Sequence, residues 1–339
     1  MPDSNYKILL RWVFCMLGYV LIAFAVLVVA YEVYNPRANQ LRVGEPNSHI
    51  LVNNTLYQDL PSQLLLAYNN IGFVGADYND TIQQSRVFFI GSSTTQNLHF
   101  PWLKTWIYTA MEGSDAWFNN AGIGGSAVNE WRQLVKSLKK YHPDFIVVLV
   151  SPFGEKDLEE NALYSKLNLM VRIRKLKLLK QMVFPYYRSL LLGKKNIGHR
   201  SVNWSALPKD TLQKNKFELY KVAGCTAALH ALIQDIKQIG AIPILISQPT
   251  PYADYTESGI DVKYLPDAQF EYDLHRYFAG QLDSLCQANQ VDFVDGFSLP
   301  PSLALYNDHT HFNTKGNLIF GHFIQKRLQG IIQKRANNE

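Results

Sequence analysis

The sequence has few cysteines and few charged residues. Its 339 residues include only three cysteines, Cys15, Cys225 and Cys286. Their wide spacing excludes CxxC redox motifs, cysteine zinc clusters and a disulfide-dense scaffold. Charged residues make up 18% of the chain and hydrophobic residues 47%, whereas soluble domains usually have about 25% charged residues. This composition excludes a disordered chain and predicts an additional apolar segment.

The most apolar stretch, residues 12–30, has nineteen residues without a charge and reads WVFCMLGYVLIAFAVLVVA. At about 1.5 Å per residue, a helix of this length spans a hydrocarbon core of roughly 30 Å. A cleaved signal peptide is the alternative, because Val28 and Ala30 fit a small-residue cleavage pattern. The stretch exceeds the roughly 7–15 apolar residues of an ordinary signal peptide, so we interpret it as an uncleaved membrane anchor. Lys7 and Arg11 precede it and Arg37 and Arg42 follow it, a balance that slightly favours a cytoplasmic amino terminus.

This orientation predicts a single-pass membrane protein. Residues 1–31 form the cytoplasmic tip and the anchor, and the rest of the chain lies on the periplasmic or extracellular side. Oxidising conditions there would allow Cys225 and Cys286 to form a disulfide. Both cysteines lie in segments with a helical pattern, which favours packed free thiols over a bridge.

The remaining sequence divides into a polar segment and a domain with a regular pattern. Residues 32–84 are rich in turn-forming residues and are interpreted as a stalk or a segment that packs against the domain. Within residues 85–335, short apolar runs alternate with longer helical patterns. The runs are VFFIG, WFNNAG, FIVVLV, IPILIS and VDFVDG, and the helical patterns lie near residues 100–112, 127–141, 216–239, 267–290 and 314–334. This alternation predicts an α/β domain with a parallel sheet covered by helices on both faces.

A basic insertion at residues 161–209 interrupts the alternation and contains no acidic residue. Its eleven Lys and Arg residues exceed the net charge of +5 of the whole chain, so the remainder is net negative. The basic residues alternate with apolar ones, which is typical both of a helix on an anionic membrane surface and of an amphipathic helix that covers a domain. Nucleic-acid binding is not expected, because no recognition motif or aromatic platform accompanies the charges.

Two polar segments contain the residue types that nucleophilic catalysis needs. Gly91, Ser92 and Ser93 follow the first apolar run, and ligands of open α/β sheets bind beyond the carboxyl ends of the strands. The alternative interpretation is that these hydroxyl groups cap the following helix. Asp308 and His311 lie in NDHTHFNTKGN, before the last helical pattern. A carboxylate at this spacing can orient a histidine as the general base for a serine.

These motifs resemble, in order and in type, those of the SGNH or GDSL-type serine hydrolases. The sequence Gly91-Ser92-Ser93 matches the G-D-S block of that family, with Ser93 as the nucleophile and Ser92 in place of the aspartate. Asp308 and His311 match the D-x-x-H block. Between them, NAGIGG at residues 120–125 matches the block that contains the oxyanion-hole glycine.

The resemblance covers residues 85–335 and implies a flavodoxin-like α/β/α sandwich with about five parallel strands. It implies a triad of Ser93, His311 and Asp308, and an oxyanion hole formed by the backbone amides of Ser93 and Gly125. The third block departs from the family, because GEKD at residues 154–157 places Lys156 where the family has an asparagine donor.

Two roles are open for Lys156. Its ammonium can donate hydrogen bonds to an oxyanion, although it is a flexible, strongly hydrated point charge. Alternatively, Lys156 faces solvent or pairs with an acidic residue, and Asn129 or Asn161 supplies the donor.

Metal binding by Asp308, His309 and His311 is the alternative use of the last motif. No other histidine or cysteine clusters with these residues in the sequence, so we expect neither a metal nor another cofactor.

The sequence therefore predicts a membrane-anchored SGNH-like serine esterase. Its predicted substrate is an acylated cell-envelope glycan or lipid from which it removes acyl groups such as O-acetyl, and its second partner is the membrane. Two alternatives stay open. The same triad could transfer the acyl group to a sugar hydroxyl as an O-acyltransferase, or the changes at Ser92 and Lys156 could mark a non-catalytic binding or assembly protein.

Overall fold

The computed structural model describes residues 44–152, 217–256, 259–261 and 268–336, apart from residues 55, 56, 58, 59 and 309, with isolated positions between residues 12 and 23. The basic insertion and most of the predicted anchor lie outside these residues. Among the helices that are described, none is both long and apolar enough to cross a membrane. The chain divides into two compact units, and the unit of residues 42–161 and 197–339 contains every element named below.

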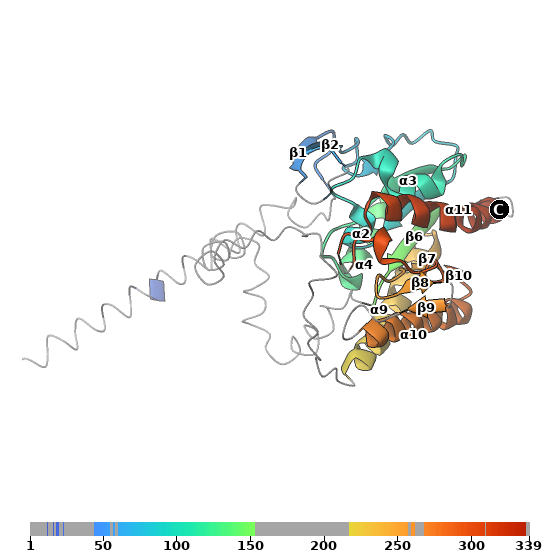
Figure 1. Ribbon diagram of the computed structural model, residues 1–339. Coiled ribbons are helices and arrows are strands. Elements are labelled where there is room, and N and C mark those ends of the chain that lie inside the picture. Colours follow the sequence, from blue (N-terminus) through green and yellow to red (C-terminus); the bar gives the residue numbers. More distant parts are fainter. Residues whose placement is uncertain are drawn as a thin grey trace, which may run out of the picture. The chain divides into compact units, whose positions relative to one another are not determined.

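A six-stranded sheet lies at the centre of this unit (Figure 1). Five strands are parallel in the order β10–β7–β6–β4–β5, and β3 is added antiparallel to β5 at the edge. Numbered along the chain and read from the β5 side, the parallel strands have the 2-1-3-4-5 order of flavodoxin-like sheets. The strands are β3 (Val74–Gly75), β4 (Arg86–Ile90), β5 (Trp117–Asn120), β6 (Phe145–Val150), β7 (Ile242–Ser247) and β10 (Asp292–Val294). The predicted α/β fold with a mostly parallel sheet is confirmed.

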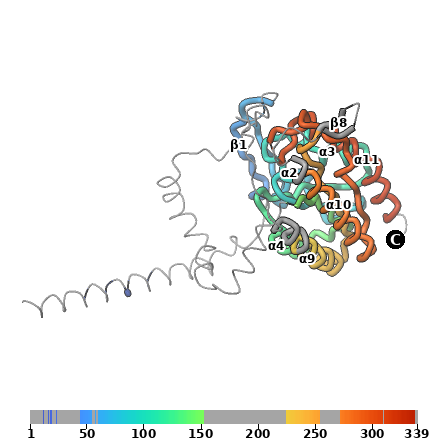
Figure 2. The backbone as a smooth tube through the Cα atoms, turned by 60° about the horizontal axis from the view of Figure 1, so that its bottom comes forward, coloured from blue at the N-terminus to red at the C-terminus, as the bar shows by residue number. Residues whose placement is uncertain are grey.

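Helices cover both faces of the sheet (Figures 1 and 2). On one face α3 (Trp106–Met111) contacts α11 (Thr314–Ala336), and on the other α9 (Phe217–Gln238) contacts both α4 (Val128–Leu138) and α10 (Ala268–Asn289). All five overlap the predicted helical patterns. The shorter elements are α2 (Ser93–Gln96), η2 (Trp102–Lys104), η3 (Lys139–Tyr141), η5 (Leu303–Leu305) and the two-stranded sheet of β8 (Asp254–Thr256) and β9 (Gly259–Asp261). Cys225 of α9 and Cys286 of α10 are both buried and are not joined to each other by a disulfide.

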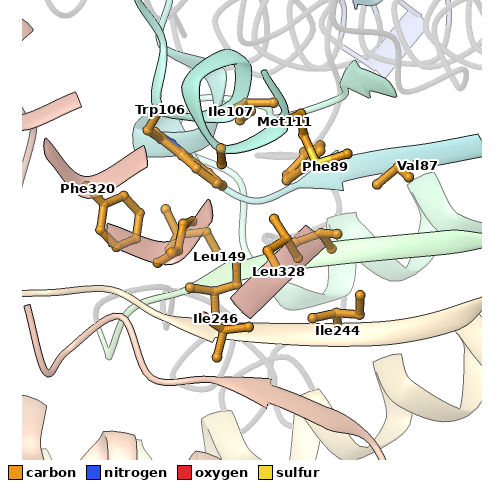
Figure 3. Packing of buried hydrophobic residues seen from close by; sticks show 14 of the residues in the cluster. Val87, Phe89, Trp106, Ile107, Met111, Leu149, Ile244, Ile246, Phe320 and Leu328 are labelled. Atoms are coloured by element: carbon orange, nitrogen blue, oxygen red, sulfur yellow. The ribbon is translucent and has the colours of Figure 1, made fainter. Parts of the chain in front are cut away.

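One hydrophobic cluster fills the space between the sheet and the pair α3 and α11 (Figure 3). Val87 and Phe89 of β4 point into this cluster, while the equally buried Phe88 and Ile90 point to the opposite face, because successive side chains of a strand alternate. Burial on both faces accounts for the continuous apolar runs in the sequence. The cluster also includes Trp106, Ile107, Met111, Leu149, Ile244, Ile246, Phe320 and Leu328.

The described part of residues 32–84 packs against the sheet. A hairpin of β1 (His49–Asn53) and β2 (Gln63–Ala67) precedes β3, which joins the sheet by pairing with β5. Buried side chains of this segment contact the loop that follows α2 and the first residue of η2. The contacting residues are Leu66, Tyr68 and Val74 on one side and Leu98 and Trp102 on the other.

Two glycines of α11 form a matched pair for testing its contact with α3. An added Cβ at Gly321 would lie 2.6 Å from Thr109 Cβ and 2.8 Å from the Trp106 carbonyl oxygen, whereas a Cβ at Gly330 would meet nothing within 4 Å. We expect Gly321→Ala to lower the free energy of unfolding by about 1–3 kcal/mol, because the two helices must separate. Gly330→Ala should raise it by about 0.5–1 kcal/mol, since alanine has the higher helix propensity. Urea unfolding measures both changes, and a Gly321→Ala variant as stable as the wild type would contradict the close contact.

Candidate active site

Ser93 lies at the point of the sheet where the strand order reverses. Strand β4 is flanked by β5, the next parallel strand along the chain, and by β6, the one after it. Ligands of doubly wound sheets bind beyond the carboxyl ends of the strands at this switch point. Because α2 begins at Ser93, three residues after the end of β4, the predicted nucleophile occupies the place where this fold binds ligands.

The turn between β4 and α2 requires glycine at position 91. An added Cβ at Gly91 would collide with the Thr95 side chain and lie 3.1 Å from the Leu149 carbonyl oxygen. Ser92 occupies the N-cap position of α2, but its side chain makes no capping hydrogen bond. The helix-capping interpretation is therefore wrong for Ser92.

Ser93, His311 and Asp308 form a continuous hydrogen-bonded chain. The Ser93 Oγ lies 2.7 Å from His311 Nε2, and His311 Nδ1 lies 2.8 Å from Asp308 Oδ2 and 2.9 Å from Oδ1. Ser93 and His311 are 218 positions apart, so the fold brings them together. With the ring proton on Nδ1, toward the carboxylate, Nε2 can accept the proton of the Ser93 hydroxyl. This is the geometry that a general base needs.

The turn from Asp308 to His311 is held by its own backbone. The amides of Thr310 and His311 donate hydrogen bonds to Asp308 Oδ1 at 2.8 and 2.7 Å. Burial alone would raise the pKa of the Asp308 carboxyl, but the hydrogen bonds and charge of His311, with the two backbone amides, outweigh burial and lower this pKa. Asp308 is therefore ionised at neutral pH and can stabilise a protonated His311.

The loop of residues 121–126 packs closely against α2. An added Cβ at Gly124 would lie 3.8 Å from Ser93 Cβ, and the Gly124 amide donates to Gln96 Oε1 at 3.0 Å. A Cβ at Gly125 would meet nothing within 4 Å, and no described residue accepts a hydrogen bond from the Gly125 amide. The structure thus places Gly124 beside Ser93. The role of Gly125 in an oxyanion hole stays a prediction.

Three of the other residues considered for the site lie outside the part of the chain that the structure describes. Lys156, Asn161 and His309 are not among the described residues, and Asn129 lies on α4. The oxyanion role of Lys156 therefore stays a prediction. In the ranges that the structure covers, no group of three or more His, Cys, Asp or Glu side chains could hold a metal ion.

Gln248 contributes contacts near the triad that were not predicted from the sequence. Gln248 directly follows β7, and only 4% of its surface is exposed to solvent. The Thr94 hydroxyl donates to Gln248 Oε1 at 2.9 Å, and Gln248 Nε2 donates to the Thr310 carbonyl oxygen at 3.1 Å. The one signal in the sequence for these contacts is that Gln248 is a polar residue at the carboxyl end of a predicted strand. That end lies at the same edge of the sheet as Ser93.

His275 of α10 is a buried histidine near Gln248. Its ring centroid lies 5.9 Å from that of Tyr252. Desolvation lowers the pKa of its imidazole to about 3, and a hydrogen bond with the Gln248 backbone opposes this shift only in part. The folded protein therefore holds His275 in its neutral form at all moderately acidic pH values.

Acid should destabilise the protein through His275. An unfolded histidine titrates near about pH 6.5, so below this pH the unfolded chain takes up a proton that the folded protein does not. The part of the free energy of unfolding that depends on neutral His275 is fully present above about pH 6.5. It is lost as the pH falls toward about 3, by up to about 1.4 kcal/mol per pH unit. We expect His275→Phe to flatten the fall of Tm between about pH 6.5 and 4, as measured by circular dichroism.

The control for this prediction is His322→Phe. His322 is exposed on α11, so its replacement should leave the acid dependence of Tm unchanged. A slope that is equal in His275→Phe and the wild type would contradict the assignment.

This chain is similar to several proteins of known structure. No family model and no curated protein matches the chain. Among solved structures, Est24, a carbohydrate acetylesterase from Sinorhizobium meliloti, is 10% identical with a TM-score of 0.44, over 73% of this chain and 100% of its own. An aryl esterase of M. smegmatis is 11% identical with a TM-score of 0.43, over 73% and 99% of the two chains. A variant of Axe2, an acetyl-xylooligosaccharide esterase from Geobacillus, is 13% identical with a TM-score of 0.41, over 71% and 93%.

Proposed function

We propose that this chain is an SGNH-type serine esterase with Ser93 as its nucleophile. The observation that carries the proposal is the hydrogen-bonded chain from Ser93 through His311 to Asp308 at the carboxyl end of β4. A serine hydroxyl is a weak nucleophile at neutral pH unless an adjacent base removes its proton. His311 supplies that base, and the ionised Asp308 orients it.

Hydrolysis proceeds in two steps on these residues. Ser93 Oγ attacks the ester carbonyl carbon while His311 Nε2 takes the hydroxyl proton, and His311 then gives that proton to the departing alcohol. A water molecule attacks the resulting acyl-Ser93 ester, again losing a proton to His311. The proton returns to Ser93 Oγ as the carboxylic acid leaves. Asp308 stabilises the imidazolium in both steps.

The oxyanion of each tetrahedral intermediate needs hydrogen-bond donors. The backbone amides of Ser93 and Gly125 are the candidates, because neither donates to another residue in the described part of the chain. The neighbouring Gly124 amide is engaged by Gln96. Lys156 is a third candidate, because it stands where the SGNH family has its asparagine donor.

The substrate is an acylated glycan or lipid of the cell envelope, with O-acetyl as the first acyl group to test. Support comes from the uncharged run at residues 12–30, which would hold an extracytoplasmic domain close to the membrane, and from the resemblance of the motifs to the SGNH family. A reporter that is active only outside the cytosol, fused after Glu339, should be active. An inactive reporter in an expressed, membrane-associated fusion would contradict this orientation.

The proposal is tested with the full chain in detergent. A fluorophosphonate probe should label the peptide that contains Ser93, and hydrolysis of p-nitrophenyl acetate should fall in proportion to labelling. Acetate release from O-acetylated glycans and from acylated lipids then separates the two substrate classes. Transfer of the acetyl group to an added sugar, in place of release, would identify an O-acyltransferase. A folded chain that is neither labelled nor active would contradict the esterase proposal and favour the binding or assembly alternative.

A further inference from the structure

We infer that Gln248 is a positioning residue that sets the geometry of Ser93 against His311, an inference that rests on the proposed esterase function. Its side-chain amide contacts one sequence neighbour of each of these two residues. These neighbours are Thr94, which follows Ser93, and Thr310, which precedes His311. One planar group thus joins the start of α2 to the turn that holds the base.

The orientation of the Gln248 amide follows from the chemistry of its partners. The Thr310 carbonyl oxygen can only accept a hydrogen bond, so it must face the Nε2 donor, at 3.1 Å. Oε1 then faces the Thr94 hydroxyl, which donates at 2.9 Å. The backbone amide of Gln248 donates to the Val150 carbonyl oxygen at 2.8 Å, which fixes the residue at the end of β6. Because the side chain is buried, losing either partner leaves a desolvated polar group.

The two side-chain hydrogen bonds of Gln248 form a bridge between α2 and the turn of residues 308–311. This bridge sets the distance between the two segments, which the other hydrogen bonds of each segment do not set. The hydrogen bonds inside the turn of residues 308–311 hold its shape but do not connect it to α2. On the α2 side, the Trp106 indole donates to the Thr94 carbonyl oxygen at 2.9 Å and fixes Thr94 to α3. Among the described residues, only Gln248 hydrogen-bonds to both segments, apart from the Ser93–His311 pair itself. Since a misplacement of about 1 Å can cost about 10²-fold in rate, the bridge should govern the efficiency of proton transfer.

The primary test is Gln248→Leu, which removes both hydrogen bonds at similar volume. We expect kcat for p-nitrophenyl acetate to fall by about 10–100-fold. KM should change by less than about threefold, because Gln248 is buried and its two side-chain hydrogen bonds go to Thr94 and Thr310. The rate of fluorophosphonate labelling at Ser93 should fall with kcat. A variant that folds and keeps both rates within about twofold of the wild type would overturn the inference.

Thr94 provides a second test that does not change Gln248. Thr94→Val removes one end of the bridge at nearly constant shape and should lower kcat by about 3–10-fold, whereas Thr94→Ser keeps the hydroxyl and should restore it. The double variant Thr94→Val/Gln248→Leu should be little slower than Gln248→Leu, because both changes break the same bridge. Additive losses would overturn the inference. Equal rates in the valine and serine variants would overturn it even if Gln248→Leu does not fold.

Gln329 of α11 is the matched control. Its amide also donates to two backbone carbonyls, those of Ala110 and Glu112, each at 3.0 Å, but it hydrogen-bonds to neither α2 nor the turn of residues 308–311. Gln329→Leu should lower Tm and leave kcat within about twofold. If kcat instead falls in step with Tm in both glutamine variants, the effect is structural and the inference is overturned. If wild-type activity and labelling do not depend on Ser93, the esterase proposal fails, and the inference fails with it.

Discussion

Ser93→Ala should abolish fluorophosphonate labelling and lower kcat for ester hydrolysis by about 10⁴-fold or more, because alanine has no nucleophilic oxygen. The fold should be retained, since the contact that is lost is the hydrogen bond from Ser93 to His311. Hydrolysis of p-nitrophenyl acetate at high enzyme concentration measures the residual rate. Circular dichroism checks that the variant is folded.

The control for this prediction is the adjacent serine. Ser92 is half-buried at the N-cap of α2 and its side chain makes no capping hydrogen bond, so Ser92→Ala should keep its rate within about tenfold of the wild type. Equal activity in Ser93→Ala and the wild type would end the serine-esterase proposal. A large loss in both variants would show that the conformation of this turn, and not the Ser93 hydroxyl alone, limits the rate.

The parallel strands could be predicted because burial on both faces leaves a local pattern. Residues Phe145–Val150 are buried at every position, so no polar residue interrupts the apolar run. The contact between Asp308 and His311 is equally local, since the two residues lie within one turn. Their alignment with Ser93 is not local, and only the matching order of the motifs made it predictable.

The strands before residue 84 could not be predicted, because they lack this pattern. Strand β1 is exposed or half-buried throughout, and the two residues of β3 pair with Asn119 and Asn120 of β5. A buried polar residue helps to hold the segment, as the Asn69 side chain donates to the Ala76 carbonyl oxygen and to Asn119 Oδ1. Such a contact over 50 positions has no signature in the nearby sequence.

Gln248 escaped prediction for the same reason. Its two side-chain partners are 154 and 62 positions away, and a glutamine after a strand is most often exposed to solvent. The sequence therefore predicted the residues of the hydrogen-bonded chain, whereas Gln248, which joins their sequence neighbours, became visible only in the folded protein.

Asp308→Asn should lower kcat by about 10³–10⁴-fold while leaving the turn intact. The asparagine Oδ1 can still accept the hydrogen bonds that the amides of Thr310 and His311 now donate to Asp308 Oδ1. Its Nδ2 is a donor, so it would place the ring proton of His311 on Nε2, toward Ser93 Oγ. His311 could then no longer accept the serine proton, and no carboxylate would stabilise the imidazolium. Steady-state kinetics and the labelling rate measure the loss.

Asp235→Asn separates this effect from the loss of any buried carboxylate. Asp235 is buried on α9 and pairs with Arg132 at 2.5 Å, so its replacement should lower Tm and leave kcat within about twofold. The lowered pKa of Asp308 adds a stability that is present above about pH 3.9 and lost as the pH falls through the folded pKa. Asp308→Asn should lack this acid-dependent part, and Asp235→Asn should retain it. If Asp308→Asn kept kcat within tenfold of the wild type, His311 would work as a base without its carboxylate, and Ser93 and His311 alone would form the catalytic unit.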